Sequence, residues 1–211
     1  MYSDVVCPWC YVGKRRLERA LTSVKREARV TWRPFQLNPT MPLDGMDRQA
    51  YLETKFGSLE TFKRMEAQLI AAGVGERIPF AFGKILRAPN TFAAHRLIWY
   101  AKRQGRQDAT VESLFHAYFV GGRDIGDAKT LGEVACEAGL EPAEAETFLT
   151  SDAGGAEVKT EEAAGHRMGI RAVPHFVLNG TYAISGAQPP EIFLSVFRRV
   201  EADRVEKATH R

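Results

Sequence analysis

Two cysteines separated by two residues lie where a strand-like segment meets a helix-like one, in the stretch VVCPWCYVGKRRLE (residues 5–18). Residues 2–6, YSDVV, predict a short strand. Pro8 suits the first position of a helix, where its missing N–H would have no partner in any case. Apolar side chains then recur every three or four positions, which predicts a helix from Pro8 to about Glu27. The chain must therefore fold so that a strand leads directly into a helix, with Cys7 at the helix N-terminus.

Strand and helix signals follow in a definite order along the rest of the chain. The stretch VTWRPFQL (residues 30–37) is β-branched and aromatic. Pro34 within it cannot donate a ladder hydrogen bond, so we expect an edge strand. Residues 47–165 are helical in pattern throughout. The stretch HFVLNGTYAIS (residues 175–185) predicts a hairpin, because its central Asn-Gly tolerates the positive φ angles of a tight turn. A last helix is expected from near Pro190.

These elements define a fold class. Without the long helical stretch, their order is βαβ–ββα. A helical crossover makes the first two strands parallel, and the hairpin adds an antiparallel pair. We therefore predict an α/β fold built from residues 1–46 and 166–211, with residues 47–165 as a large inserted all-helical domain.

The Cys7–Cys10 pair has the spacing of a redox-active dithiol. At the helix N-terminus, free backbone N–H groups and the positive end of the helix dipole favour the thiolate of Cys7. Cys10 lies one turn further along the same face, which permits a disulfide with little backbone movement. We expect Cys7 to be exposed and nucleophilic, and Cys10 to be more buried and to resolve the mixed disulfide that Cys7 forms. Trp9 carries no charge, so we expect a less oxidising couple than a Cys-Pro-His-Cys site would form.

Two other interpretations of the cysteine pair compete with redox chemistry. A closed zinc site needs about four ligands. The third cysteine, Cys136, lies in a helical apolar pattern, however, and the five histidines show no ligand spacing. We therefore expect no metal, and we expect Cys136 to be a small core residue. The second alternative is that Cys7 and Cys10 are two unreactive core thiols.

A second signal is Val173-Pro174, which lies directly before the predicted hairpin. Most X-Pro bonds are trans, so the dipeptide alone means little. A cis proline at this place would pack against the sulfur atoms of Cys7 and Cys10. It would also present the backbone of Val173 to an extended peptide, as in strand addition.

Charge and hydropathy argue against several classes of protein. The formal net charge is +3, and the basic run that begins at Lys14 lacks interleaved aromatic residues, which disfavours nucleic-acid binding. This run is either a solvated helix face or, through Lys14 and Arg15, a source of positive charge near the thiols. We find no apolar signal segment and no run of about 18 apolar residues, so we expect a cytoplasmic protein that does not enter a membrane. The sequence contains no coiled-coil pattern, so it does not indicate an oligomeric state.

Several motifs together resemble a known family. The stretches SDVVCPWCYVGKRRLE (residues 3–18) and IRAVPHFVLNGTYAISGAQ (residues 170–188) resemble the DsbA-like thioredoxin family. WRPFQLNP (residues 32–39) and PNTFAAHRL (residues 89–97) are similar to its cytoplasmic FrnE-type dithiol–disulfide oxidoreductases. The resemblance covers nearly the whole chain. Related proteins of this fold are 2-hydroxychromene-2-carboxylate isomerase and the kappa-class glutathione transferases.

The resemblance implies a fold and a set of site residues. The fold is a thioredoxin fold with an inserted all-helical domain. Cys7 is implied as the nucleophile, Cys10 as the resolving thiol and Val173–Pro174 as the cis-proline loop. Asn90 and His95 are implied to lie near the active-site cleft and to contribute to substrate binding. The alternatives are that Asn90 is the N-cap of its helix and that His95 is a buried core histidine.

The resulting expectation is a thiol–disulfide oxidoreductase or isomerase that acts on protein or small-molecule thiols and disulfides. No tightly bound cofactor is expected, and glutathione is a candidate substrate or reductant. One alternative is a glutathione-dependent isomerase or transferase, but relatives of that kind replace the first thiol with serine. Another is a non-catalytic peptide-binding module, which would not need two thiols. We expect the N-terminus of this chain to be cropped, because members of the resembled family usually carry a few more residues before the first strand. Asp4 does not match the register of their buried acidic residue, so it is assigned no proton-transfer role.

Overall fold

A four-stranded mixed sheet is the centre of the fold in the computed structural model, which describes residues 1–24 and 28–209. The strand order is β2-β1-β5-β6, with β1 parallel to β2 and antiparallel to β5, and with β5 antiparallel to β6. The predicted βαβ–ββα order and the edge position of Pro34 are therefore confirmed. The strands are β1 (Tyr2–Ser3), β2 (Arg33–Pro34), β5 (His175–Leu178) and β6 (Tyr182–Ser185).

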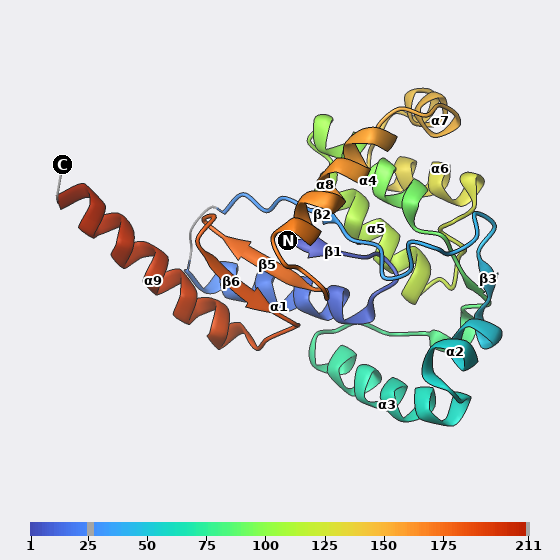
Figure 1. The fold of residues 1–211 in the computed structure, drawn as a ribbon, viewed down its shortest axis with the longest axis horizontal. Coiled ribbons are helices and arrows are strands. Elements are labelled where there is room, and N and C mark those ends of the chain that lie inside the picture. The colour runs from blue at the N-terminus through green and yellow to red at the C-terminus, as the bar shows by residue number, and fades with distance from the viewer. Residues whose placement is uncertain (25–27, 210–211) are drawn as a thin grey trace.

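Helices cover both faces of this sheet (Figure 1). On one face, α1 (Pro8–Val24) lies beside α9 (Pro190–Thr209), and the ring of Phe176 in β5 meets that of Phe193 edge to face at 4.8 Å between centroids. On the other face, α8 (Gly155–Arg167) lies against Tyr2, whose ring leaves no room for a Cβ at Gly165. Val177 packs on the same side as Tyr2. Successive residues of β5 thus point to opposite faces, as a strand requires.

The segment between β2 and β5 consists mainly of helices, as predicted, and it also contains a short antiparallel pair of strands. The assignment of residues 47–165 as a separate domain stays a prediction. The elements are β3 (Met46–Asp47), α2 (Arg48–Phe56), α3 (Leu59–Gly75), the 3₁₀ turn η1 (Phe82–Lys84), β4 (Arg87–Ala88), α4 (Phe92–Arg103), α5 (Gln107–Phe119), α6 (Ala128–Glu137), α7 (Pro142–Thr150) and α8.

Aromatic stacking joins this helical segment directly to the helix that carries the cysteines. The ring of Tyr11 in α1 stacks on that of Phe115 in α5, with centroids 4.9 Å apart and planes at 13°. The Tyr11 hydroxyl also donates to Glu112 Oε1 over 2.8 Å. Because an aromatic pair buries a large apolar area in one fixed geometry, α1 is held against both the sheet and the inserted helices.

The strands are shorter than the predicted segments 2–6 and 30–37. The first ends early because the chain turns at once into α1, with the Cys7 N–H donating to the Asp4 carbonyl over 3.1 Å. In the second, Pro34 has no N–H, and the strand is limited to Arg33 and Pro34, which pair with Tyr2 and Ser3. The predicted end of the first helix at Glu27 lies outside the described residues.

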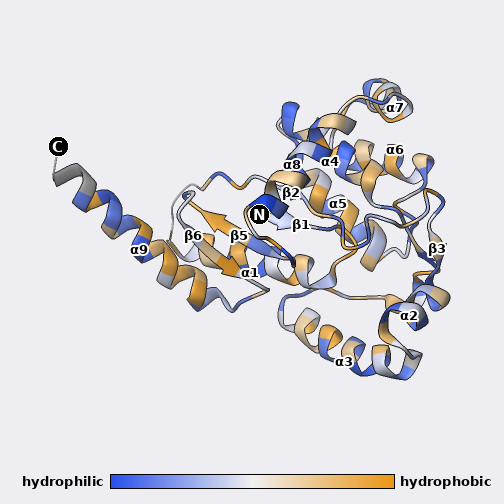
Figure 2. Cartoon of the chain, in the orientation of Figure 1, coloured by the Kyte–Doolittle hydropathy of each residue, from blue (hydrophilic) through white to orange (hydrophobic). Residues whose placement is uncertain are grey.

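The hairpin and the last helix follow their predicted patterns. Asn179 and Gly180 have φ angles of 52° and 72°, and both lie between β5 and β6. Figure 2 shows apolar residues concentrated on β5 and β6, whereas apolar and polar residues alternate along α9. This alternation is typical of a helix that covers a sheet with one side only. Within residues 1–24 and 28–209, no helix is long and apolar enough to cross a membrane.

Candidate active site

The two cysteines lie at the N-terminus of α1, as the sequence predicts. Cys7 immediately precedes Pro8, the first residue of α1, and the Cys10 N–H donates to the Cys7 carbonyl over 2.9 Å. Both cysteines are free thiols. Cys7 is 5% exposed and Cys10 is fully buried. The expected order of burial is correct, but the expectation of an exposed Cys7 is wrong, because its side chain lies against the loop before β5.

The loop before β5 reaches Cys7 through its backbone. The Val173–Pro174 peptide bond is cis, and the Cys7 Sγ atom donates to the Val173 carbonyl oxygen over 3.7 Å. Gly13 permits this approach, because a Cβ there would lie 3.1 Å from both Pro174 Cγ and Phe176 Cζ. The glycine thus lets α1 lie directly against the loop that faces the thiol.

The surroundings of Cys10 favour its neutral form. Burial is the main cause that raises the pKa of Cys10 well above its usual range, and the adjacent Cys7 thiol adds to it. The Ser3 side chain and the Asp4 backbone act in the opposite direction but do not outweigh burial. Cys10 therefore carries its proton at neutral pH, and it must lose this proton before it can attack a disulfide.

A cleft of about 230 Å³ opens beside Cys7, between Trp9 and the inserted helices α2 and α3. Its walls are largely apolar, and Asn38, Arg48, Tyr51 and Lys55 supply its polar groups. The Lys55 ammonium donates to the Tyr51 hydroxyl over 2.6 Å. Neither cation has a carboxylate partner in the described part of the chain. The apolar lining consists mainly of Val6, Leu37, Met41, Leu52, Phe56, Phe62, Met65, Leu69, Phe82 and Phe119.

Asn90 and His95 do not line this cleft. The Asn90 side chain donates to the Met41 carbonyl over 2.7 Å and accepts from the Phe92 N–H over 2.9 Å. Asn90 thus satisfies a free N–H at the start of α4, one position before the N-cap residue Thr91. It also holds the backbone of Met41, a residue of the cleft wall. This arrangement matches the capping alternative more closely than direct contact with a substrate.

His95 is buried on the inner side of the cysteine junction, beside an acidic residue. Its Nε2 atom lies 3.3 Å from Asp4 Oδ1. The other carboxylate oxygen of Asp4 accepts from the Leu37 N–H over 2.7 Å. Sequence reasoning assigned Asp4 no role, although an acidic residue in a short apolar strand-like run is itself an unusual signal. The structure makes Asp4 the fully buried partner of His95.

The basic residues that follow the cysteines are engaged in ion pairs. Lys14 is buried, and its ammonium lies 3.1 Å from Glu112 and 3.3 Å from Asp108. Arg15 pairs with Glu18 over 3.0 Å and also contacts Glu112. Their positive charge is therefore balanced by nearby carboxylates. Lys14 is neither part of a solvated helix face nor an unpaired positive charge near the thiols.

Cys136 is exposed, so its predicted place in the core is wrong. The buried face of α6 is formed by Leu131, Val134 and Ala135, and the next position along the helix turns towards solvent. Among the residues that the structure describes, no group of three or more His, Cys, Asp or Glu side chains could hold a metal ion.

Comparisons with known proteins point to one family. A family model described as a DSBA-like thioredoxin domain matches residues 1–198. The uncharacterized protein YwbO of Bacillus subtilis (strain 168) is 28% identical over 199 residues, with 92% of each chain covered. The crystal structure of a probable DsbA oxidoreductase from Streptomyces coelicolor is similar with a TM-score of 0.87 and 33% identity, covering 95% of this chain and 88% of that one.

A more distant solved structure is similar in fold. It is the cytosolic disulfide reductase DsbM from Pseudomonas aeruginosa, determined with GSH. Its TM-score is 0.65 at 22% identity, covering 94% of this chain and 97% of that one. At this identity the similarity concerns the fold alone.

Proposed function

The chain belongs to the DsbA-like thioredoxin family, and we propose that it is a dithiol–disulfide oxidoreductase with Cys7 as nucleophile and Cys10 as resolving thiol. The observation that carries this proposal is the position of the pair. Cys7 lies at a helix N-terminus, in reach of the Val173 carbonyl, and Cys10 lies fully buried one turn behind it. Membership of the family supports thiol–disulfide chemistry in general, and the assignment of the two roles rests on this geometry.

The reaction proceeds in two exchange steps. The Cys7 thiolate attacks one sulfur of a substrate disulfide, the substrate S–S bond breaks, and the other substrate sulfur leaves as a thiolate that takes a proton from water. Cys10 then loses its proton and attacks the Cys7 sulfur. The mixed disulfide breaks, the second substrate thiolate leaves, and a Cys7–Cys10 disulfide remains. The substrate disulfide gains two electrons, and the protein dithiol loses two.

The cleft and the loop before β5 both border Cys7, so each is placed to contact a different part of a substrate bonded to its sulfur. We infer that the Val173–Pro174 backbone docks the chain of a peptide or of glutathione, and that the apolar cleft takes a side group of the substrate. The cleft is wide enough, at about 230 Å³, for a side chain or a small molecule but not for a folded partner. Asn90 contributes indirectly, by holding the cleft wall at Met41.

Protein or small-molecule thiols and disulfides are the partners that this chemistry requires. Glutathione, as a soluble thiol, would return the oxidised pair to its dithiol form in two exchange steps and is itself oxidised to its disulfide. The proposed reaction requires no tightly bound cofactor, no metal and no nucleic-acid or membrane partner. A cytoplasmic, FrnE-type dithiol–disulfide oxidoreductase is the form of this proposal that the motifs of residues 32–39 and 89–97 favour.

The experiment that tests the proposed function is a redox equilibrium of the Cys7–Cys10 pair in glutathione buffers, read by thiol trapping and mass spectrometry. A reversible disulfide is expected. A potential near that of thioredoxin, about −270 mV, would make the protein a reductase, and one near about −120 mV would make it an oxidant. If no reversible disulfide forms, the oxidoreductase proposal is wrong, and a glutathione-dependent isomerase or transferase or a peptide-binding module takes its place.

A further inference from the structure

The polar groups of the cleft beside Cys7 present mainly hydrogen-bond donors. The Asn38 amide and the Lys55 ammonium both donate to the Tyr51 hydroxyl oxygen, each over 2.6 Å. Lys55 also donates to Asn38 Oδ1 over 3.3 Å, so the amide acceptor is engaged as well. Because the Tyr51 oxygen already accepts two hydrogen bonds, its own O–H is free to donate to a ligand in the cleft. This side of the cleft therefore offers a ligand protons and positive charge.

The second cation of the cleft, Arg48, is half-buried and held by aromatic rings. Its guanidinium carbon lies 5.4 Å from the centroid of the Phe62 ring and 5.8 Å from that of the Phe82 ring. It also lies beside the hydroxyl of Tyr118. Contacts between a cation and ring faces orient the guanidinium but do not neutralise it. Arg48 therefore keeps a positive charge, in a fixed place among apolar walls, that can pair with a ligand.

The carboxylates nearest to these cations in the sequence are engaged elsewhere. Asp47 caps α2 by accepting a backbone N–H over 2.9 Å. Glu53 is exposed and accepts from Gln49 Nε2 over 3.1 Å. In the part of the chain that the structure describes, neither Arg48 nor Lys55 has an acidic partner. Because an unpaired charge in apolar surroundings is costly, charge complementarity predicts an anionic ligand.

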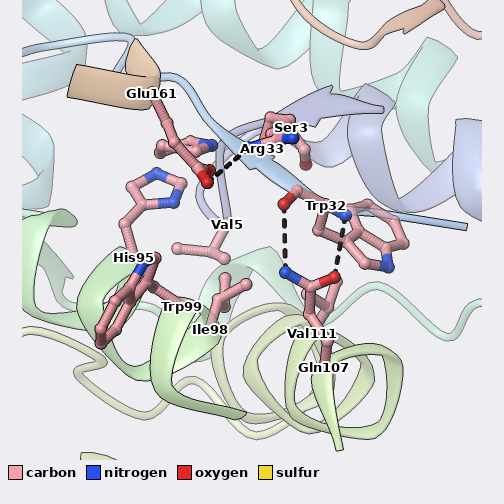
Figure 3. A pocket seen from close by; sticks show the side chains of 11 residues that line it. Ser3, Val5, Trp32, Arg33, His95, Ile98, Trp99, Gln107, Val111 and Glu161 are labelled. Carbon is pink, nitrogen blue, oxygen red and sulfur yellow. Dashed lines mark hydrogen bonds and ion pairs between the residues drawn. The ribbon is translucent and has the colours of Figure 1, made fainter. Parts of the chain in front are cut away.

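A smaller cavity beside β1 and β2 shows the opposite arrangement (Figure 3). Its volume of about 10 Å³ is close to the minimum that holds one water molecule. The cation that lines it, Arg33, pairs with Glu161. The Gln107 side chain exchanges two hydrogen bonds with the Trp32 backbone, each over 3.1 Å. This cavity has no room for a ligand and its positive charge is balanced within the chain, whereas the larger cleft combines space with unbalanced charge.

We propose that the cleft binds a small apolar carboxylate, with Arg48 pairing with the carboxylate and the apolar walls enclosing the rest of the ligand. Its volume of about 230 Å³ corresponds to roughly eight water molecules at about 30 Å³ each, which is the size of one substituted ring. Where it names the substrate, this inference rests on the proposed function. The substrate class is then a thiol or disulfide whose sulfur is attached to an apolar group that carries a carboxylate.

An extended peptide and glutathione suit this cleft less well. Each peptide unit brings an N–H donor, which the donors of the cleft cannot satisfy, and a buried N–H without a partner is costly. Glutathione is polar along its whole length, so it has no group for the apolar walls. The backbone of Val173 remains the place where such chains dock, and the cleft selects the group on the other side of the sulfur.

A ligand without sulfur tests this site separately from the redox chemistry. Isothermal titration calorimetry of the reduced protein at neutral pH compares 4-methylbenzoate with its neutral analogue 4-methylbenzamide. The two ligands have the same shape and differ in charge. We expect the carboxylate to bind about tenfold more tightly than the amide, because hydrogen bonds to a charged group contribute more than those between neutral groups.

Protection of the neighbouring thiol shows where the ligand binds. Iodoacetamide should alkylate Cys7 more slowly as 4-methylbenzoate fills the cleft, with half-protection near the calorimetric Kd. The exposed Cys136 on α6 is the internal control in the same sample, and its rate should not change. Binding that leaves the rate of Cys7 unchanged would place the ligand elsewhere and overturn the inference.

Substitution of the guanidinium identifies the group that pairs with the carboxylate. Arg48→Met should weaken binding of 4-methylbenzoate about tenfold and change that of the amide less than about twofold. The matched control is Arg103→Met, because Arg103 is exposed and lies over the Trp99 ring, 5.2 Å from its centroid, outside the cleft. It should leave both affinities unchanged. If Arg48→Met does not fold, Lys55→Gln decides: a loss of about two- to fivefold for the carboxylate alone supports the site, and an unchanged preference contradicts it.

Two results with the wild-type protein would overturn the inference. One is equal affinity for the acid and the amide, and the other is no binding of either. Both are distinct from a failure of the proposed function, because the titrated ligands contain no sulfur. A protein that binds the carboxylate but forms no reversible Cys7–Cys10 disulfide would contradict the proposed function and the substrate class, and would still support the carboxylate site.

Discussion

The Cys7 Sγ atom donates to the Val173 carbonyl oxygen over 3.7 Å, although 166 positions separate the two residues in the chain. This contact joins the N-terminus of α1 to the loop before β5, at the end of the sheet where β1 ends and its antiparallel neighbour β5 begins. It places the thiol against a backbone carbonyl rather than in open solvent. A substrate sulfur bonded to Cys7 would therefore begin its chain beside the backbone of Val173.

The first prediction concerns the relative reactivity of the three cysteines. We expect iodoacetamide to modify Cys7 faster than Cys136 at neutral pH, although Cys136 is the exposed one, because the helix N-terminus stabilises the Cys7 thiolate. Cys10 should be slowest, since it is fully buried and its pKa is raised. Quenched labelling followed by peptide mass spectrometry measures all three rates. Faster labelling of Cys136 than of Cys7 would contradict the assignment of Cys7 as nucleophile.

The second prediction concerns the packing of α1 against the loop before β5. Gly13→Ala should destabilise the protein by about 1 kcal/mol, because its Cβ would lie 3.1 Å from both Pro174 and Phe176. Phe176 cannot yield, since its ring is buried against Phe193. Urea unfolding gives the free energy.

Gly132→Ala in α6 is the matched control for this substitution. Apart from its chain neighbours and the nearby backbone of its own helix, no atom lies within 4 Å of the position of its Cβ. It should therefore stabilise the protein by about 0.5–1 kcal/mol through helix propensity alone. A stabilising Gly13→Ala would show that α1 does not need its close approach to the loop.

Local sequence patterns are enough to predict most of the fold and the part of the site that the cysteine pair forms. The strand–helix junction at Cys7 and the hairpin at Asn179–Gly180 are both determined by residues within a few positions of each other. Short-range rules apply to such features, because a turn or a helix N-terminus depends on neighbouring backbone angles.

The features that sequence analysis missed depend on contacts between distant segments. The amphipathic pattern of α4 shows that His95 is on a helix but not that Asp4 lies opposite it. The apolar faces of α2 and α3 indicate burial, and only the tertiary structure turns them into a cleft beside Trp9. Cys136 is exposed although cysteine is among the residue types most often buried, because it lies one position beyond the buried face of α6 that Leu131, Val134 and Ala135 form.

The third prediction concerns the buried ammonium of Lys14. Lys14→Met should reduce the free energy of unfolding by about 1–3 kcal/mol at neutral pH, because Glu112 loses a partner 3.1 Å away while it stays partly buried. Arg123→Met is the matched control, since its partners Glu133 and Glu137 are exposed. It should cost less than about 1 kcal/mol.

The stability deficit of Lys14→Met should also depend on pH. Burial acts to raise the pKa of Glu112, but Lys14, Tyr11 and Arg15 outweigh it and lower the pKa from 4.5. A lowered carboxyl pKa contributes stability that is fully present above the unfolded value and is lost as pH falls through the folded one. The difference between wild type and variant should therefore shrink below about pH 4.5. A difference that is constant from neutral pH to pH 3 would contradict the role of Glu112.

The last prediction concerns the charge of the cleft beside Cys7. Lys55 has no carboxylate partner in the described structure, and its ammonium points to the Tyr51 hydroxyl and to Asn38 Oδ1, 3.3 Å away. An exposed cation at the mouth of an apolar cleft should favour disulfides that carry a carboxylate on their apolar group. Lys55→Gln keeps a polar side chain and removes the charge. It should raise KM for a carboxylated aromatic disulfide roughly two- to fivefold, the value of one exposed ion pair, and leave KM for its uncharged amide unchanged. Steady-state reduction of the two compounds measures this ratio, and equal effects on both would show that the substrate does not enter the cleft near Lys55.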